Sequence, residues 1–186
     1  MKSLAIIPAR AGSKRLPKKN KLHLDKKPLI MYTIDAVLKS NMFDKIILST
    51  NDSDIIQIGK KIKGITVEDR DEELSGDFVK VIDLVYKIIN RDDIKNNYDK
   101  VGLFLPTCPF RNAKHIIDAV KLLKPDDYSV VSVTEMNDPV QLCVSINQNN
   151  VIDSNMFFNP SPLVTGNTRS QDFQIYYEPI YLIIFF

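Results

Sequence analysis

Residues 4–28 read LAIIPARAGSKRLPKKNKLHLDKKP, and this stretch decides the fold. Leu4–Ile7 form a short aliphatic run typical of a buried parallel strand, and Pro8 then removes a backbone donor and ends the strand. A turn of small residues follows at positions 11–13. Small residues let backbone N–H groups approach an anion closely. The stretch therefore predicts a strand that leads directly into an anion-binding turn.

Positive side chains surround this turn, namely Arg10, Lys14, Arg15, Lys18, Lys19 and Lys21. Such groups donate charge-assisted hydrogen bonds to phosphate oxygens, although a basic run also fits a solvated face or a weak nucleic-acid patch. Its position after a buried strand favours a small-ligand site, because ligands of open α/β sheets bind outside the carboxyl ends of the strands. The loop has neither the P-loop spacing nor the G-x-G-x-x-G spacing.

The composition predicts one globular domain over residues 1–186, because 44% of the residues are hydrophobic and 26% are charged. The net charge of +2 makes the basic loop a local feature and argues against a nucleic-acid partner. The first apolar run is too short for a signal peptide, and no run of about 18 apolar residues suggests a membrane span. We therefore expect a cytoplasmic protein without membrane contact.

The cysteines and histidines give no sign of a metal site. Cys108 and Cys143 lie far apart, in no metal-ligand spacing, and both are predicted to be free thiols. His23 and His115 share no short metal spacing with each other or with a carboxylate pair. The residues themselves thus predict no metal ligands.

Strands and helices are expected to alternate along the chain. The central parallel strands are predicted at 4–7, 46–48, 101–105 and 130–133. Helical periodicity lies between them and predicts a doubly wound α/β fold, a mostly parallel sheet with helices on both faces. The apolar tail after Glu178 is expected to act as a further strand.

Three predicted helices carry specific expectations. Asp52 or Ser53 should cap the helix after the second strand, and Asn112 should cap the helix that follows it. The helix predicted over residues 78–89 is expected to bury one face, made of Phe78, Val81, Ile82, Val85 and Ile89.

Residues 137–172 differ in sequence pattern and composition from the rest of the chain. QLCVSINQNNVIDS alternates as a hairpin does, with Asn149-Asn150 at its turn, and residues 155–172 are rich in Asn, Pro and Ser. We interpret residues 137–172 as a small hairpin excursion from the single domain.

The runs IIPARAGSKRLPKKN, KPLIMYTIDAVLKS and DKIILSTND resemble the nucleotide-binding start of the acylneuraminate (CMP-sialic acid) cytidylyltransferase family. The resemblance continues more loosely through DRDEELSGD, LPTCPFR, SVVSVTE and TRSQD. It implies a Rossmann-like nucleotidyltransferase that joins CMP from CTP to the anomeric hydroxyl of a nine-carbon sugar acid and releases pyrophosphate, with Mg²⁺ as cofactor. It also implies a homodimer, with residues 137–172 on the dimerisation and sugar side.

The same resemblance implies the site residues. Arg10 and Lys19 would be catalytic, because they would offset charge on the triphosphate. The implied nucleotide-binding residues are Ala9, Arg10, Gly12, Ser13, Lys14, Lys19, Asn20, Arg70, Asp77, Pro106 and Thr107. The implied substrate-binding residues are Arg111, Arg169 and Gln171. Bland alternatives stay open: a turn residue for Asn20, a surface ion pair for Arg70 and a surface position for Arg111.

The chain also departs from the family pattern. Leu105 stands where the family usually has Gln, which leaves the acceptor open among sialic, legionaminic, pseudaminic and related acids. The ending YYEPIYLIIFF lacks the family's Asn-Gly-Ala strand and its later magnesium-binding aspartates, so we expect a chain truncated at its C-terminus. Two functions remain in view: an active cytidylyltransferase, or a weak or inactive homologue that binds nucleotide or a partner subunit.

Overall fold

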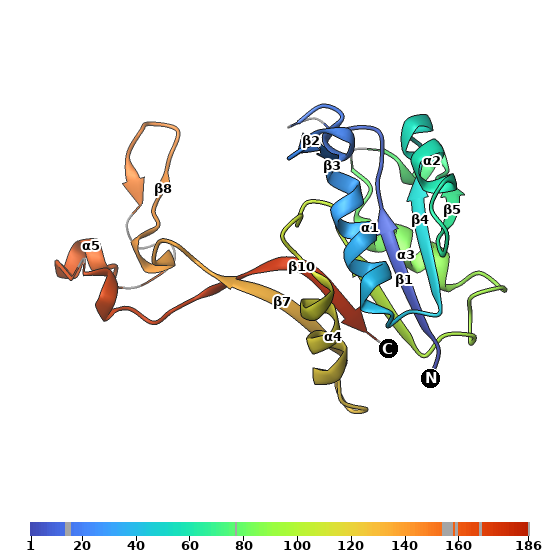
Figure 1. The fold of residues 1–186 in the computed structure, drawn as a ribbon. Helices are drawn as coiled ribbons and strands as arrows, with labels where there is room; N and C mark the ends of the chain where they lie inside the picture. The colour runs from blue at the N-terminus through green and yellow to red at the C-terminus, as the bar shows by residue number, and fades with distance from the viewer. Residues whose placement is uncertain (14–15, 77, 154–157, 159, 168, 186) are drawn as a thin grey trace. The chain divides into compact units, whose positions relative to one another are not determined.

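The computed structural model describes residues 1–13, 16–76, 78–153, 158, 160–167 and 169–185 (Figure 1). The chain divides into two compact units. Unit 1 comprises Met1–Ser132 with Tyr181–Phe186, and unit 2 comprises Val133–Ile180. The predicted excursion at 137–172 falls within unit 2.

The sheet has six strands in the order β5-β4-β1-β6-β10-β7. Their bounds are β1 (Ser3–Pro8), β4 (Lys45–Thr50), β5 (Thr66–Asp69), β6 (Lys100–Phe104), β7 (Ser129–Glu135) and β10 (Tyr177–Phe185). β1 pairs in parallel with both β4 and β6, and β4 pairs in parallel with β5. β10 runs antiparallel to β6. The four neighbouring strands β5, β4, β1 and β6 thus form the parallel part of the sheet.

The predicted strands all lie in this one sheet, and the tail after Glu178 forms β10 as predicted. The prediction that residues 130–133 lie among the central parallel strands was wrong, because β10 separates β7 from β6 and leaves β7 at the edge. Side chains along β7 alternate between half-buried and exposed, as an edge strand allows, whereas every residue of β1 is buried.

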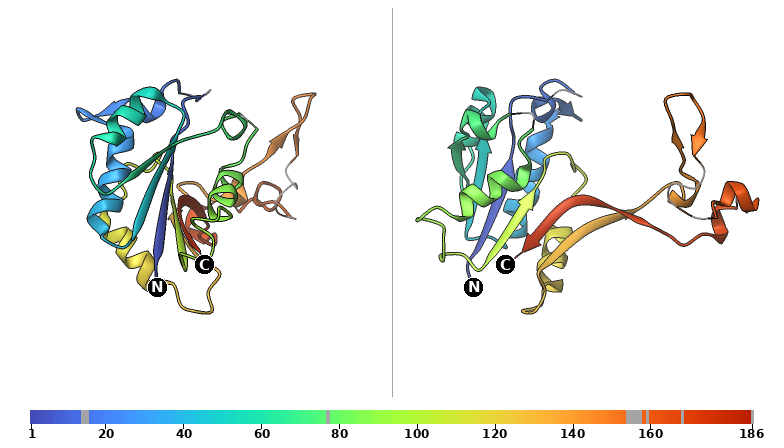
Figure 2. Two further views of the ribbon diagram at one scale, coloured as in Figure 1. Left: turned by 90° about the vertical axis from the view of Figure 1, so that its right-hand side faces the viewer. Right: turned by 180° about the vertical axis from the view of Figure 1, so that it is seen from behind.

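Helices cover both faces of the parallel strands (Figure 2). In unit 1 they are α1 (Leu29–Ser40), α2 (Ser53–Lys60), α3 (Val81–Ile89) and α4 (Ala113–Leu122). Ala5 and Ile7 of β1 pack in the cluster that includes α1, α2 and α4, while Leu4 and Ile6 pack in the cluster that includes α3. This alternation of side chains confirms the doubly wound prediction. None of the described helices has the length and apolar character to cross a membrane.

Two predicted helix caps are confirmed. The Asp52 carboxylate accepts hydrogen bonds from the backbone N–H groups of Asp54 and Ile55, at 3.0 and 3.3 Å, and so caps α2. The Asn112 side-chain oxygen accepts from the N–H of His115 at 3.1 Å and caps α4. Both contacts satisfy donors that the first turn of a helix leaves open.

The buried face predicted for the third helix was partly wrong. The helix begins only at Val81, where the N–H of Lys80 donates to the Asp83 carboxylate at 3.0 Å. Its buried residues are Leu84, Val85 and Ile88, whereas Phe78 is 98% exposed and Ile82 is 51% exposed. Because Phe78 precedes the helix, it does not set the buried face, and the apolar stripe follows residues 81, 84, 85 and 88 instead.

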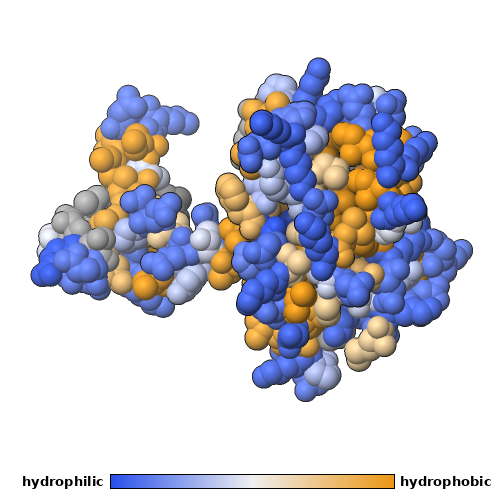
Figure 3. All heavy atoms as spheres, viewed as in Figure 1, coloured by the Kyte–Doolittle hydropathy of each residue, from blue (hydrophilic) through white to orange (hydrophobic). Residues whose placement is uncertain are grey.

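Short elements complete the chain. In unit 1 they are η1 (Lys19–Lys21), β2 (His23–Leu24), β3 (Lys27–Pro28) and η2 (Glu72–Leu74). In unit 2 they are η3 (Val140–Leu142), β8 (Ser145–Ile146), β9 (Ile152–Asp153), α5 (Pro162–Thr165) and η4 (Ser170–Asp172). β8 and β9 pair as the predicted hairpin, with Asn150 in the left-handed region at its turn. Figure 3 shows hydrophobic side chains on this hairpin, where Ile146, Val151 and Ile152 are exposed.

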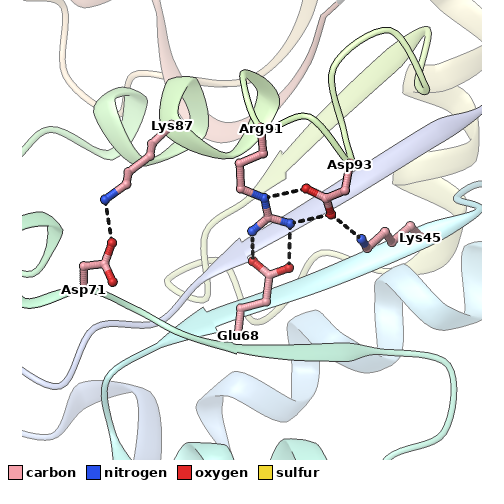
Figure 4. A network of polar contacts seen from close by, with 6 residues as sticks. All are labelled: Lys45, Glu68, Asp71, Lys87, Arg91 and Asp93. Carbon is pink, nitrogen blue, oxygen red and sulfur yellow. Dashed lines mark hydrogen bonds and ion pairs between the residues drawn. The ribbon is translucent and has the colours of Figure 1, made fainter.

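A network of ion pairs fastens edge strand β5 to the α3 side of unit 1 (Figure 4). The Arg91 guanidinium donates two hydrogen bonds to Glu68, at 2.7 and 3.0 Å, and also contacts Asp93 at 3.0 Å. Lys45 of β4 reaches Asp93 at 3.5 Å. The hydrogen bonds that Arg91 donates to Glu68, and then those to Asp93, raise the pKa of Arg91, so the charged form is favoured. Planar paired contacts of this kind fix both position and orientation.

We predict that Arg91→Met lowers the free energy of unfolding by about 1.5–3 kcal/mol, because it removes hydrogen bonds between charged groups at a half-buried position. Urea denaturation measures the change. Lys114→Met is the matched control, since it removes an exposed ion pair with Asp118 within α4 and should cost below about 0.5 kcal/mol. Equal losses in the two variants would contradict the prediction.

Candidate functional site

A pocket of about 250 Å³ opens where parallel strands end. β1 ends at Pro8, Arg70 directly follows β5, and Leu105 directly follows β6. Because parallel strands share a direction, their carboxyl ends deliver these residues to one edge of the sheet. The residues that line the pocket are Pro8, Arg10, Gly12, Ser13, Lys19, Asn20, Arg70, Val79, Val81, Leu105, Pro106 and Thr107.

Most residues predicted to bind nucleotide lie together on this wall. They are Arg10, Gly12, Ser13, Lys19, Asn20, Arg70, Pro106 and Thr107. Ala9 is fully buried behind them, where its N–H donates to the Ser49 carbonyl at 2.8 Å and its own carbonyl accepts from the Thr50 hydroxyl at 2.6 Å. Lys14 and Asp77 lie outside the described residues.

Side-chain contacts brace the backbone of the loop after β1. The N–H of Ala11 donates to the Asn51 side-chain oxygen at 2.8 Å. Asn20 is buried, and its amide donates to the Arg10 carbonyl at 3.2 Å. Asn20 thus braces the loop as well as lining the pocket, which fits its alternative interpretation as a turn residue. These two contacts fix the backbone where the turn at 11–13 begins.

The cations of the loop do not all serve the pocket. Lys21 turns to the carboxylates of Asp54 and Asp52, at 2.7 and 3.0 Å, and their hydrogen bonds raise its pKa. Arg10 lines the pocket and donates from Nη1 to the Gly76 carbonyl at 2.8 Å. Lys19, in η1, lines the pocket beside it. Among the described residues of the loop, Arg10 and Lys19 therefore bring positive charge to the pocket.

Arg70 is a buried cation rather than a surface one. It is 7% exposed, it donates from Nη2 to the Leu74 carbonyl, and its Nε has no hydrogen-bond partner among the described residues. Burial lowers the pKa of Arg70, and the nearby charge of Arg10 lowers it further. An anion between the two guanidinium groups would relieve both effects.

Two of the acids near Arg70 in sequence are engaged elsewhere. Glu68 pairs with Arg91, and Asp71 pairs with Lys87 (Figure 4). The burial of Arg70 itself argues against the alternative of a surface ion pair. The described residues that line the pocket include no Asp or Glu, and they include the cations Arg10, Lys19 and Arg70. Such a pocket attracts anions.

Pro8 and Leu105 line the pocket but were not among the predicted binding residues, and two further lining residues, Val79 and Val81, were not predicted either. These two valines lie at the start of α3, where the periodicity placed Val81 on a buried helix face and gave no reason to connect either residue with β1. With Leu105 and Pro106 they add apolar surface to the cationic loop. A pocket with charge on one part of its wall and apolar side chains on another suits a ligand that joins a phosphate chain to rings.

Arg111 does not line the pocket, although it was predicted to bind substrate. It is 9% exposed and donates from Nη2 to the Leu105 carbonyl at 2.8 Å and to the Thr33 hydroxyl at 3.1 Å. Its burial also argues against a surface position at the start of α4. This placement favours a structural role over the predicted sugar contact.

Arg169 and Gln171, the other predicted substrate residues, belong to unit 2. Arg169 is exposed and pairs with Asp172 at 3.6 Å. With its amide oriented to satisfy both groups, Gln171 accepts from the Arg169 guanidinium at 3.1 Å. Gln171 also lines a pocket of about 330 Å³ within unit 2, together with residues 135–139 and 173–176. Their contact with a sugar acid stays a prediction.

The described residues do not fit a metal site. They contain no group of three or more His, Cys, Asp or Glu side chains that could hold an ion. His115 accepts from the N–H of Asn112 at the start of α4. Neither Cys108 nor Cys143 forms a disulfide, as predicted.

Comparison with known proteins relates the chain to one family. A family model described as cytidylyltransferase matches residues 4–180. The chain is 42% identical over 143 residues to N-acylneuraminate cytidylyltransferase of Escherichia coli O18:K1:H7, a match that spans 76% of this chain and about a third (33%) of that relative. It is 40% identical over 162 residues to CMP-N,N'-diacetyllegionaminic acid synthase of Legionella pneumophila, with 84% and 68% covered. It is 35% identical over 154 residues to pseudaminic acid cytidylyltransferase of Campylobacter jejuni, with 82% and 66% covered.

Solved structures share the fold. CMP:2-keto-3-deoxy-manno-octonic acid synthetase complexed with CTP matches with a TM-score of 0.67 at 18% identity, over 100% of this chain and 74% of that chain. 4-Diphosphocytidyl-2C-methyl-D-erythritol synthase from Anaerococcus prevotii matches with a TM-score of 0.64 at 21% identity, over 99% and 70%. At these identities the likeness supports the fold alone.

We predict that the pocket binds inorganic triphosphate, because its described wall carries positive charge and no carboxylate. Arg10→Ala and Lys19→Ala should each weaken binding at least about tenfold, since one charge-assisted contact is worth about 1.5–3 kcal/mol. Calorimetry measures the affinity. Lys121→Ala removes an exposed charge from α4, outside the pocket wall, and should leave the affinity within about twofold. Unchanged binding in both loop variants would contradict the prediction.

Proposed function

This chain belongs to the cytidylyltransferase family, and on that premise we propose that it transfers CMP from CTP to a nine-carbon acidic sugar of the sialic acid type. The observation that carries the proposal is the pocket at the ends of β1, β5 and β6. Its wall combines the cations Arg10, Lys19 and Arg70 with small loop residues and an apolar portion. These features suit a nucleoside triphosphate.

The cationic part of the wall supports a triphosphate site. Arg10 and Lys19 would offset charge on the phosphates, and the turn at Gly12 and Ser13 is small enough for backbone N–H groups to approach them. Arg70 would gain an anionic partner for its buried guanidinium. The apolar side chains of Val79, Val81 and Leu105 would then face the non-phosphate parts of the reactants.

In the proposed reaction, the anomeric hydroxyl oxygen of the sugar acid attacks the α-phosphorus of CTP. A new P–O bond forms to the sugar, and the bond from the α-phosphorus to the bridging oxygen breaks. That oxygen leaves with the bonding electron pair as part of pyrophosphate, while the hydroxyl proton passes to solvent. Arg10 and Lys19 would stabilise the charge that shifts toward pyrophosphate, so catalysis would rest on position and electrostatics.

The remaining predictions rest on the family resemblance. They are magnesium as cofactor, a homodimer and a cytoplasmic location. Because the described pocket wall offers no carboxylate, its residues do not fit a protein-bound metal ion, and the proposed steps use only the chain's own groups. Bound divalent metal would supply further neutralisation of phosphate charge.

The acceptor is proposed as a class. The three relatives compared above are named for N-acylneuraminate, N,N'-diacetyllegionaminic acid and pseudaminic acid. Leu105 on the pocket wall brings an apolar side chain rather than an amide to the bound reactants. The alternative of a weak or inactive homologue gains no support from these comparisons.

The test is pyrophosphate release from CTP with magnesium and a panel of the three sugar acids. We expect turnover with at least one of them, and loss of at least about 100-fold in Arg10→Ala, the cost typical of one preorganised electrostatic contact. Replacing CTP with ATP or GTP serves as the nucleotide control. No pyrophosphate release with any acceptor, despite tight CTP binding, would favour the non-catalytic alternative.

A further inference from the structure

The Arg111 side chain packs against Phe104 and is hydrogen-bonded to α1 and to the segment that follows β6. Its guanidinium lies 5.3 Å from the centre of the Phe104 ring, and Phe104 in turn packs edge-on against Phe43. Nη2 donates to the Thr33 hydroxyl of α1 and to the Leu105 carbonyl. One side chain therefore connects β6, helix α1 and the first residue after the strand.

Arg111 contacts the loop that leaves β6 at two points. Its side chain holds the Leu105 carbonyl at 2.8 Å, and its backbone N–H donates to the Cys108 carbonyl at 3.2 Å. The loop contains Pro106 and Pro109, which have no N–H to donate, so it has few ways to fix its own backbone. The guanidinium supplies a donor just past the point where the β6 ladder ends.

Because Arg111 is buried, its hydrogen-bond partners must be accurately placed. Burial lowers the pKa of Arg111 to about 10, so the guanidinium remains charged at neutral pH. A buried charge is tolerated only where its partners are well placed, and removal of those partners is costly. The Leu105 carbonyl is therefore held in a narrow range of positions.

We infer that Arg111 is a positioning residue, which sets the Leu105–Thr107 segment of the pocket wall through the Leu105 carbonyl and makes no contact with ligand. Leu105, Pro106 and Thr107 all line the pocket, while Arg111 does not. The inference uses the proposed function only for the choice of CTP as probe.

Arg111→Met tests the inference, because Met keeps much of the volume and loses the donors. The affinity of the Arg111→Met variant for CTP, measured by calorimetry below its melting temperature, should be lower than that of the unmodified protein by roughly tenfold or more. Hydrogen exchange in peptides that cover residues 105–111 should rise. Arg111→Lys retains one ammonium donor and should restore part of both properties. If Arg111→Met does not fold, Arg111→Lys carries the test: its affinity for CTP should lie below that of the unmodified protein, and its hydrogen exchange over residues 105–111 should be faster.

Two controls separate position from general stability. Thr33→Val removes the hydroxyl acceptor of α1 and spares the Leu105 contact, so it should lower the melting temperature while CTP affinity stays within about twofold. Arg91→Met removes an arginine network outside this pocket and should behave likewise. Equal weakening of CTP binding in both controls and in the Arg111 variants would overturn the inference, as would unchanged affinity in the Arg111 variants. Failure of the unmodified protein to bind CTP would instead count against the proposed function.

Discussion

The parallel pairing of β1 with β4 on one side and with β6 on the other is the constraint on which unit 1 depends. β1 is buried along its whole length, so its register fixes both neighbours and both helical layers. Since parallel strands end at one edge, the chain leaves the sheet repeatedly at the same place. The loop with Arg10, the buried Arg70 and the Leu105–Thr107 segment meet there for that reason.

Positive charges gather at the same edge of the sheet. Arg10 lies near enough for its charge to lower the pKa of the buried Arg70, and two acids close by in sequence, Asp71 and Glu68, are paired with Lys87 and Arg91. The pocket thus holds like charges close together. A bound polyanion would offset the repulsion between these cations, and this relief would contribute to the free energy of binding.

Local patterns carried much of the prediction. The strands, the caps at Asp52 and Asn112, the hairpin in unit 2 and the composition of the basic loop all follow from short-range rules. Features that depend on residues far apart in the sequence do not follow from such rules. The position of β10 between β6 and β7 depends on a return of the chain after unit 2, and the inward turn of Arg111 depends on Thr33, far away in sequence. Periodicity also misjudged α3, because it cannot locate the first helical residue after an irregular loop.

The place of β10 in the sheet bears on how the protein is made. Every described residue that lines the pocket precedes residue 108, whereas the strand that pairs with the open side of β6 comes from Tyr177–Phe185. A chain emerging from the ribosome therefore carries the described lining residues of this pocket while one edge of β6 still lacks its neighbour, and unit 2 must emerge before that edge closes. An unpaired edge beside strongly apolar strands invites association with other chains. Early occupation of the pocket by nucleotide would stabilise the partly synthesised sheet by mass action during that interval.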